Sequence, residues 1–286
     1  MTSAKYGTSN HHPISLRLDL LTPSSFLAIL DVMATYPGGK AGAGTYQKII
    51  NLIPPHSVYV EPFVGGAAIY RAKAPAEKSI LIDLVPSALQ AIPISRGLHI
   101  ICDDGIQWLR DNLPMLPADT FIYCDPPYVI STRKSGPRYE YEMADTQHED
   151  LLAILAEASC RIMISGYWSS LYASRLAASQ WRHTTFMAMT RGGTMAEEHL
   201  WMNYDPPVKL HDHKYAGKDF RERERIKRKV QRWTRKLQGM GHLELSSLLS
   251  AIAAAEASLV SKGDTSENDE WCRSLAMASG NDVRFS

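Results

Sequence analysis

The chain has 286 residues, 45% of them hydrophobic, which is enough to enclose one large core or a core plus an appendage. Its longest apolar runs fall far short of the roughly 18–20 residues that span a bilayer, and its first residues lack a basic-then-apolar leader. We therefore expect a cytoplasmic protein with no membrane partner. Four widely spaced cysteines without a Cys-x-x-Cys pair argue against a disulfide framework or a zinc site, so we predict no metal.

The net charge of +1 conceals one strongly basic segment. Between Lys214 and Lys236 there are eleven basic residues against three acidic ones, a net charge of +8, which leaves −7 for the rest of the chain. Such a segment is typical of a nucleic-acid contact. The alternative is a solvated helix in which Glu222 pairs with Lys227 and Glu224 with Arg228.

From Tyr36 onward, short β-branched or aliphatic runs alternate with segments of helical spacing. This alternation predicts an α/β fold, a Rossmann-like and mainly parallel sheet with helices on both faces. The clearest helices are 149–159 and 168–179, and a turn between the runs 182–189 and 197–204 predicts a terminal antiparallel hairpin. Before residue 34 we expect little beyond a short helix after Ser25. The predicted parallel strands are Val58–Val60, Ile80–Asp83, His99–Cys102, Phe121–Cys124 and Arg161–Ser165.

After Pro207 the pattern changes to helices without strands. A basic helix is predicted over 220–238 and an Ala- and Leu-rich helix over 243–261, separated by a glycine-containing break, so the two should form a C-terminal helical hairpin. Polar residues dominate from Gly263, which predicts a poorly ordered tail. The predicted organisation is an N-terminal extension (1–35), an α/β domain (36–207), a basic helical appendage (208–262) and the tail (263–286).

Unusual residues follow the first three predicted strands, where an open parallel sheet binds its ligands. Gly65 and Gly66 would let a ligand approach the backbone closely, although a tight strand-to-helix turn explains them equally well. Asp83 lies about 20 residues further on, where nucleotide-binding sheets place a carboxylate for ribose hydroxyls, and capping the next helix is nearly as good an explanation. Either Asp103 or Asp104 could accept a hydrogen bond from an adenine amino group while the other caps a helix.

The stretch Asp125-Pro126-Pro127-Tyr128 ends the fourth strand. Prolines that stop a strand explain part of it, but not Tyr128. An exocyclic nucleobase amine is a poor nucleophile, because its lone pair is delocalised into the ring. The Asp125 carboxylate and the Pro126 carbonyl could accept its two hydrogens and draw the nitrogen toward tetrahedral geometry, while Tyr128 stacks on a flipped base. Attack on an electrophilic methyl group then needs little beyond in-line positioning.

Seven stretches, in one order, resemble the DNA adenine methylases of the Dam type, especially their phage-like members: Tyr36–Lys40, Tyr59–Gly66, Asp83–Pro86, Cys102–Leu109, Tyr123–Tyr128, Ile164–Tyr172 and Glu197–Tyr204. The resemblance covers about Tyr36 to Pro207 and implies a class I methyltransferase fold that uses S-adenosylmethionine. It implies that an extruded adenine of double-stranded DNA is held for N6 methylation by Asp125, Pro126 and Tyr128. It also implies that the cofactor is bound by Tyr36, Lys40, Glu61, Pro62, Phe63, Gly65, Gly66 and Asp83, with Asp104 beside its adenine.

One departure from the larger members of that family concerns target recognition. The 15 residues between Leu109 and Asp125 leave no room for a recognition domain. Because phosphate contacts position DNA without identifying bases, we predict short or relaxed sequence specificity. DNA contacts are then expected either from the loop that carries Arg133, Lys134 and Arg138 or from the basic helix, through Arg228, Arg232 and Arg235.

Two other interpretations stay open. The first keeps the chemistry but changes the amine to cytosine N4, an adenine in RNA or a protein glutamine amide. The second is a non-catalytic DNA-binding protein on a methylase scaffold, against which the retention of Gly65, Gly66, Asp83, Asp125 and Tyr128 argues. The resemblance leaves open whether a cognate restriction enzyme accompanies the protein.

Overall fold

The computed structural model describes residues 39–42, 44–133, 139–178, 181–190 and 193–261. Three predicted site residues, Tyr36, Lys134 and Arg138, lie outside the described residues. So do the short helix expected after Ser25 and the ranges 1–35 and 263–286.

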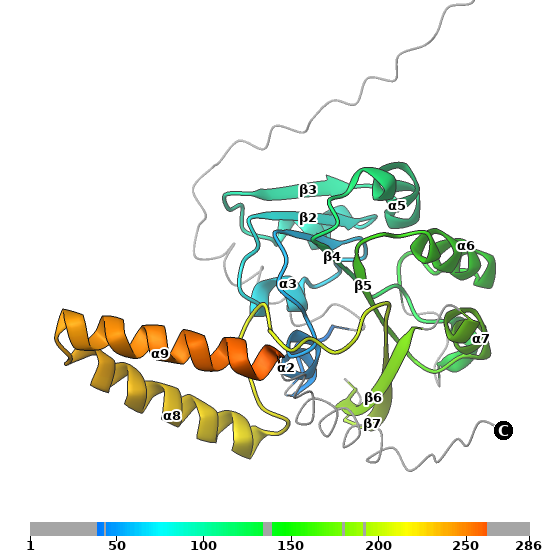
Figure 1. Ribbon diagram of the computed structural model, residues 1–286. Helices are drawn as coiled ribbons and strands as arrows, with labels where there is room; N and C mark the ends of the chain where they lie inside the picture. The colour runs from blue at the N-terminus through cyan, green and yellow to red at the C-terminus, as the bar shows by residue number, and fades with distance from the viewer. Residues whose placement is uncertain (1–38, 43, 134–138, 179–180, 191–192, 262–286) are drawn as a thin grey trace, which may run out of the picture.

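A seven-stranded sheet with the order β3-β2-β1-β4-β5-β7-β6 forms the centre of the body (Figure 1). Strands β1 to β5 pair in parallel, whereas β7 is antiparallel to both β5 and β6. The predicted fold class, a mainly parallel Rossmann-like sheet with a terminal antiparallel hairpin and C-terminal helices, is confirmed. The strands are β1 (Val58–Glu61), β2 (Lys78–Asp83), β3 (Leu98–Cys102), β4 (Thr120–Cys124), β5 (Arg161–Gly166), β6 (Arg182–Met189) and β7 (Met195–Met202).

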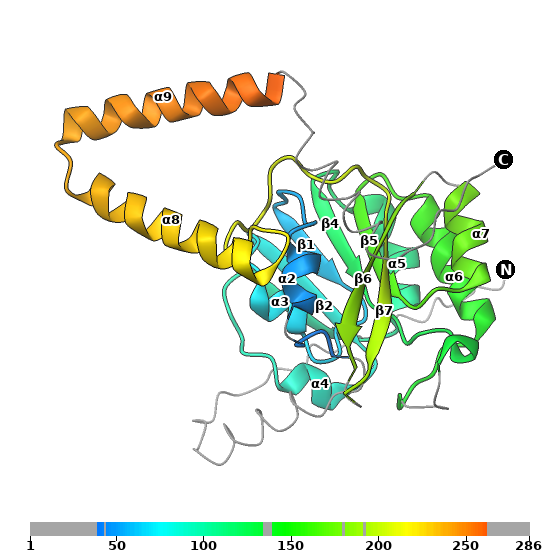
Figure 2. The same cartoon turned by 90° about the horizontal axis from the view of Figure 1, so that it is seen from below.

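Helices cover both faces of this sheet (Figures 1 and 2). Because side chains alternate along a strand, Val58 and Val60 face one core and Tyr59 faces the other. The core that contains Tyr59 packs against α2 (Thr45–Ile50), α3 (Ala68–Ala72) and α4 (Pro86–Gln90). The core that contains Val58 and Val60 packs against α5 (Gly105–Asn112), α6 (Asp145–Ala156) and α7 (Ser170–Ala178). Two short 3-10 turns, η1 (Leu113–Met115) and η2 (Ile130–Thr132), complete the body.

Central strands covered on both faces explain the continuous apolar runs in the sequence. β1 and β4 are buried along their whole length, whereas the edge strand β3 is partly exposed. The carboxyl ends of the five parallel strands therefore meet at one edge, and the loops that follow them are brought together there.

The C-terminal helices α8 (Phe220–Gln238) and α9 (His242–Ser261) leave the body as a hairpin whose arms diverge from the turn at 239–241 (Figure 2). Asp219 caps α8 by accepting a hydrogen bond from the Glu222 backbone N–H at 2.8 Å. No residue of α8 is buried. The hairpin extends on the side of the sheet away from α5, which follows the carboxyl end of β3 (Figure 1). No helix within the described ranges is long and apolar enough to cross a membrane.

Candidate active site

A cavity of about 700 Å³ lies at the carboxyl edge of the sheet. Asp125 and Pro127, which follow β4, line this cavity. Pro126 and Tyr128 are buried and do not line it. The strand order thus brings together residues that lie far apart in the sequence. The lining includes all the described residues that the sequence predicts to bind a cofactor: Lys40, Glu61, Pro62, Phe63, Gly65, Gly66, Asp83 and Asp104.

The turn after β1 is shaped by Gly65 and Asp83. Gly65 has a φ of 46°, in the left-handed region that glycine adopts without a Cβ clash. Its backbone N–H donates to Asp83 Oδ2 at 2.7 Å, and the Val85 N–H donates to Asp83 Oδ1 at 2.9 Å. Burial raises the pKa of the Asp83 carboxyl above its usual value. Asp83 therefore holds the glycine turn in place and also lines the cavity.

The third strand tip combines a helix cap with a close backbone approach. Asp104 Oδ1 accepts from the Ile106 N–H at 2.8 Å and caps α5, while Asp103 accepts from the Asp104 N–H. A Cβ atom on Gly105 would lie 2.1 Å from the Pro62 carbonyl oxygen. Glycine at position 105 thus allows the start of α5 to pack directly against the turn after β1, and this contact forms part of the cavity wall.

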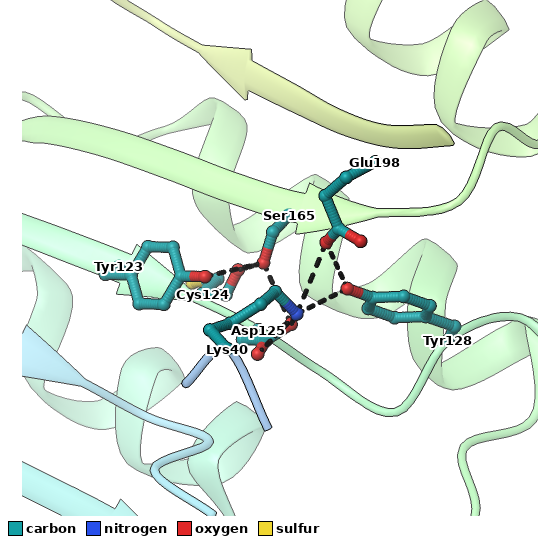
Figure 3. Close-up of polar contacts among 7 residues, drawn as sticks. All are labelled: Lys40, Tyr123, Cys124, Asp125, Tyr128, Ser165 and Glu198. Carbon is teal, nitrogen blue, oxygen red and sulfur yellow. Dashed lines mark hydrogen bonds and ion pairs between the residues drawn. The ribbon is translucent and has the colours of Figure 1, made fainter. Parts of the chain in front are cut away.

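The Lys40 ammonium group binds Asp125, the acid of the set Asp125, Pro126 and Tyr128 that is predicted to hold the adenine and is called the base clamp below (Figure 3). Contact of Lys40 with the cofactor stays a prediction. Lys40 Nζ donates to Asp125 Oδ1 at 2.6 Å and to Oδ2 at 2.8 Å, and it also donates to the Tyr128 hydroxyl at 2.5 Å. Glu198 Oε1 lies 3.3 Å from the same nitrogen. Burial by itself lowers the pKa of this ammonium, but the facing Asp125 and Glu198 carboxylates outweigh it and hold the pKa above its usual value.

Glu198 and Ser165 are site residues to which the sequence assigned no role. The Tyr128 hydroxyl donates to Glu198 Oε1, and burial raises the pKa of the Glu198 carboxyl. Ser165 Oγ donates to Asp125 Oδ1 at 2.8 Å and lies 2.9 Å from the Tyr123 hydroxyl. One signal for Glu198 existed, because two consecutive glutamates within a strand must face opposite sides of the sheet.

These contacts fix the Tyr128 ring in an enclosed position. Its hydroxyl is engaged by Lys40 and Glu198, and its ring packs edge-to-face on Tyr167 with centroids 4.6 Å apart. The side chain is only 8% exposed. Stacking of Tyr128 on a flipped base stays a prediction.

A second buried polar group lies where β1 ends. Glu61 Oε2 accepts from the Tyr59 hydroxyl at 2.8 Å, and burial raises the pKa of the Glu61 carboxyl to about 8. The Lys73 ammonium lies 4.0 Å from the centroid of the Tyr59 ring, and burial lowers its pKa to about 8. Burial at this part of the cavity wall therefore favours the neutral form of the Glu61 carboxyl group.

Arg133 is placed differently from what a DNA contact requires. Its guanidinium forms an ion pair with Glu142 at 2.7 Å and donates to the Tyr128 carbonyl. With 6% of its side chain exposed, Arg133 tethers the loop after the Asp-Pro-Pro-Tyr stretch internally. Its predicted role in DNA binding gains no support from this placement.

Arg228, Arg232 and Arg235 of α8 are exposed, and no ion pair within the described part of the chain engages them. The glutamates expected to neutralise this helix form different pairs. Glu222 pairs with Arg225 at 3.0 Å, and Glu224 pairs with Lys227 at 3.6 Å, because residues three apart face the same side of a helix. Arg228 therefore stays available for a phosphate.

The described residues contain no group of three or more His, Cys, Asp or Glu side chains that could hold a metal ion.

Comparison with solved structures finds distant likenesses. A precorrin 8W decarboxylase of Methanobacterium thermoautotrophicum is 10% identical with a TM-score of 0.38, over 59% of this chain and 92% of that one. A magnesium protoporphyrin IX methyltransferase from Synechocystis PCC 6803, with bound SAM, is 13% identical with a TM-score of 0.35. The match covers 62% of this chain and 78% of that one. A SAM-dependent methyltransferase from Agrobacterium tumefaciens is 11% identical with a TM-score of 0.34, over 56% of this chain and 59% of its own length, less than two thirds.

No family model matches the chain, and no curated protein matches it. Structural likenesses this distant do not identify a ligand or a reaction of this chain. The function is inferred from the side chains at the strand tips.

Proposed function

We propose that the protein transfers a methyl group from S-adenosylmethionine to the N6 amine of an adenine extruded from double-stranded DNA. The observation that carries this proposal is the position of Asp125. Its carboxylate lies at the end of β4, on the wall of the cavity formed by the predicted cofactor residues, and already binds an amino group, that of Lys40.

The cavity suits a cofactor of this kind. Its volume of about 700 Å³ lies within the roughly 300–1,000 Å³ that small-molecule sites occupy. Gly65 leaves its wall free of a side chain, and Asp83 and Asp104 supply carboxylate oxygens that can accept from ribose hydroxyls and an adenine amino group. When bound, S-adenosylmethionine would supply the electrophilic methyl group.

The residues of the chain position the amine and accept hydrogen bonds from its two hydrogens. Ser165 orients the Asp125 carboxylate, which has lone pairs for one amine hydrogen. The rigid Pro126 ring directs its carbonyl as the second acceptor, and Tyr128 is held by its own hydrogen bonds. The methylated nitrogen carries a positive charge and loses its proton readily, so this proposal requires no strong base.

Exposed aromatic side chains support a single-stranded or flipped-base substrate. Tyr141, which lines the cavity, is 47% exposed, and Trp168, in the loop after β5, is 57% exposed. Aromatic rings of this kind stack on unpaired bases, each contact contributing about 1–3 kcal/mol. The α8 arginines would add phosphate contacts on DNA beyond the target site, which is compatible with short or relaxed specificity.

The decisive experiment incubates the protein with labelled S-adenosylmethionine and unmethylated DNA, RNA or protein, followed by nucleoside and amino-acid analysis. N6-methyladenine in DNA that disappears with Asp125→Ala supports the proposal. Transfer exclusively to cytosine N4, RNA or glutamine would refute the substrate assignment. DNA binding without transfer to any acceptor would support the non-catalytic alternative.

A further inference from the structure

The clamp proposed to bind a target amine holds an amine of the protein itself. Both oxygens of Asp125 accept from Lys40, at 2.6 and 2.8 Å. A target amine that approaches Asp125 must therefore share the carboxylate with the Lys40 ammonium or replace it.

A second carboxylate stands next to the same ammonium. Glu198 Oε1 lies 3.3 Å from Lys40 Nζ, compared with 2.6 Å for the nearer oxygen of Asp125. Glu198 comes from β7, which β5 separates from β4, the strand that leads to Asp125, and its side chain is 7% exposed (Figure 3). Lys40 is thus held between two acids, and a small movement of its flexible stem exchanges one for the other.

We propose that Glu198 takes over the Lys40 ammonium when the target amine binds to Asp125, so that Glu198 is a positioning residue for the reaction. This inference rests on the proposed function and assigns Glu198 a role within the same site.

The electrostatics of the reaction favour such an exchange. The reacting nitrogen gains positive charge in the transition state, and an ammonium beside it opposes that charge. Two full unit charges about 4 Å apart, at an effective dielectric constant of about 20, would raise the barrier by a factor on the order of a thousand, and this is the upper limit because the nitrogen carries only part of a unit charge in the transition state. A move of Lys40 toward Glu198 reduces this repulsion, and it keeps the buried ammonium paired, which avoids the large cost of an isolated buried charge.

Glu198 has the capacity for this second contact. Its Oε1 already accepts from Tyr128, but a carboxylate offers about four lone-pair sites, so it can accept from Tyr128 and Lys40 together. Tyr128 keeps its hydroxyl contact with Glu198 throughout, and the ring stays in place while the lysine moves.

The test uses Glu198→Gln, which keeps the size of the side chain and an oxygen for Tyr128 but removes the charge. Lys40→Met and the double variant complete the cycle. Glu197→Gln is the matched control, because Glu197 is the neighbouring acid on β7 and pairs with His199 instead. Binding of S-adenosylhomocysteine and thermal unfolding establish that each variant is folded. The main measurement compares two affinities in the presence of S-adenosylhomocysteine. One is for a single-stranded oligonucleotide that contains adenine, and the other is for the same oligonucleotide with purine in place of each adenine.

Purine lacks the N6 amine, so the ratio of the two affinities reports on occupation of Asp125. We expect Glu198→Gln to lower this affinity ratio roughly tenfold, which corresponds to the loss of one charged hydrogen bond. The variant should also lower kcat and leave cofactor binding unchanged. Lys40→Met in the same chain should restore the preference, and Glu197→Gln should leave it intact.

Two results would overturn the inference. The first is that Glu198→Gln keeps the adenine preference. The second is that adding Lys40→Met to Glu198→Gln fails to restore the preference, which would mean that Glu198 acts through Tyr128 alone. A wild-type protein that binds S-adenosylhomocysteine but shows no adenine preference and methylates no DNA refutes the proposed function itself, and the exchange with it.

Discussion

Replacing Asp125 by asparagine tests the central acceptor of the proposed site. The amide preserves the volume of the side chain but removes the charge and one acceptor oxygen. In the wild-type protein the carboxylate accepts two hydrogen bonds from Lys40 and one from Ser165, at 2.6, 2.8 and 2.8 Å. The amide nitrogen cannot accept from the Lys40 ammonium, because both groups are donors. Glu198 would then be the remaining carboxylate next to that buried ammonium.

The expected losses differ between stability and rate. A hydrogen bond to a charged group is worth about 1.5–3 kcal/mol, so we expect Asp125→Asn to lower the free energy of unfolding by roughly that amount. Loss of an acceptor that acts on the reacting group should lower kcat by about 10²–10³-fold, by analogy with removal of one preorganised hydrogen-bonding group. Affinity for S-adenosylhomocysteine should change little, since the predicted cofactor contacts at Gly65, Asp83 and Asp104 stay intact.

The assay compares initial methylation rates at saturating cofactor and DNA, together with calorimetric binding of S-adenosylhomocysteine and thermal unfolding. Asp111→Asn, an exposed acid on α5 that contacts Gln107, is the matched control and should behave as wild type. If Asp125→Asn retains kcat within roughly tenfold of wild type while folded, Asp125 does not act on the amine, and the mechanism is wrong.

Three further predictions concern the cavity wall and the basic helix. Because burial raises the pKa of Glu61 from 4.5 to about 8, the stability that its neutral form provides is fully present below pH 4.5 and is lost as the pH rises through 8. The thermal stability of Glu61→Gln should therefore fall less than that of the wild type between pH 4.5 and 8. Parallel plots of melting temperature against pH for the two proteins would contradict this prediction. Gly105→Ala should lower the free energy of unfolding by about 1–3 kcal/mol and weaken S-adenosylhomocysteine binding, because its Cβ would lie 2.1 Å from the Pro62 carbonyl oxygen. Gly239→Ala is the control and should be tolerated, because the nearest atom to its Cβ would be 3.7 Å away. Changing Arg228, Arg232 and Arg235 to glutamine should weaken DNA binding and flatten its salt dependence by about 0.9 per lost phosphate contact, and an unchanged slope would exclude these arginines as the contact. Arg225→Gln, which removes an arginine of the same helix that is already paired with Glu222, is the control and should change the slope less than the loss of any one of the three.

The local sequence determined most of the fold. Short apolar runs predict β1 to β5, and helical spacing predicts α6, within a few residues, because these patterns depend on which side chains one element must bury. The residues after the strands could also be recognised, since Gly65, Asp83 and Asp125 stand where the chain leaves a buried strand, which is where an open parallel sheet binds its ligands. Parallel pairing then places them around one cavity.

Only the tertiary structure decided how the charged groups are paired. Lys40 and Asp125 are 85 positions apart, and Tyr128 and Glu198 are 70 apart, so no local pattern connects them. Arg133 is basic in a polar loop, yet the fold turns it inward to Glu142. The direction of α8, away from the carboxyl edge of the sheet, likewise depends on where the chain leaves the body (Figure 1). Strand and helix patterns arise from neighbours along the chain, whereas the partner of a buried charge is set by strand order and by which side chains the closed core leaves facing one another.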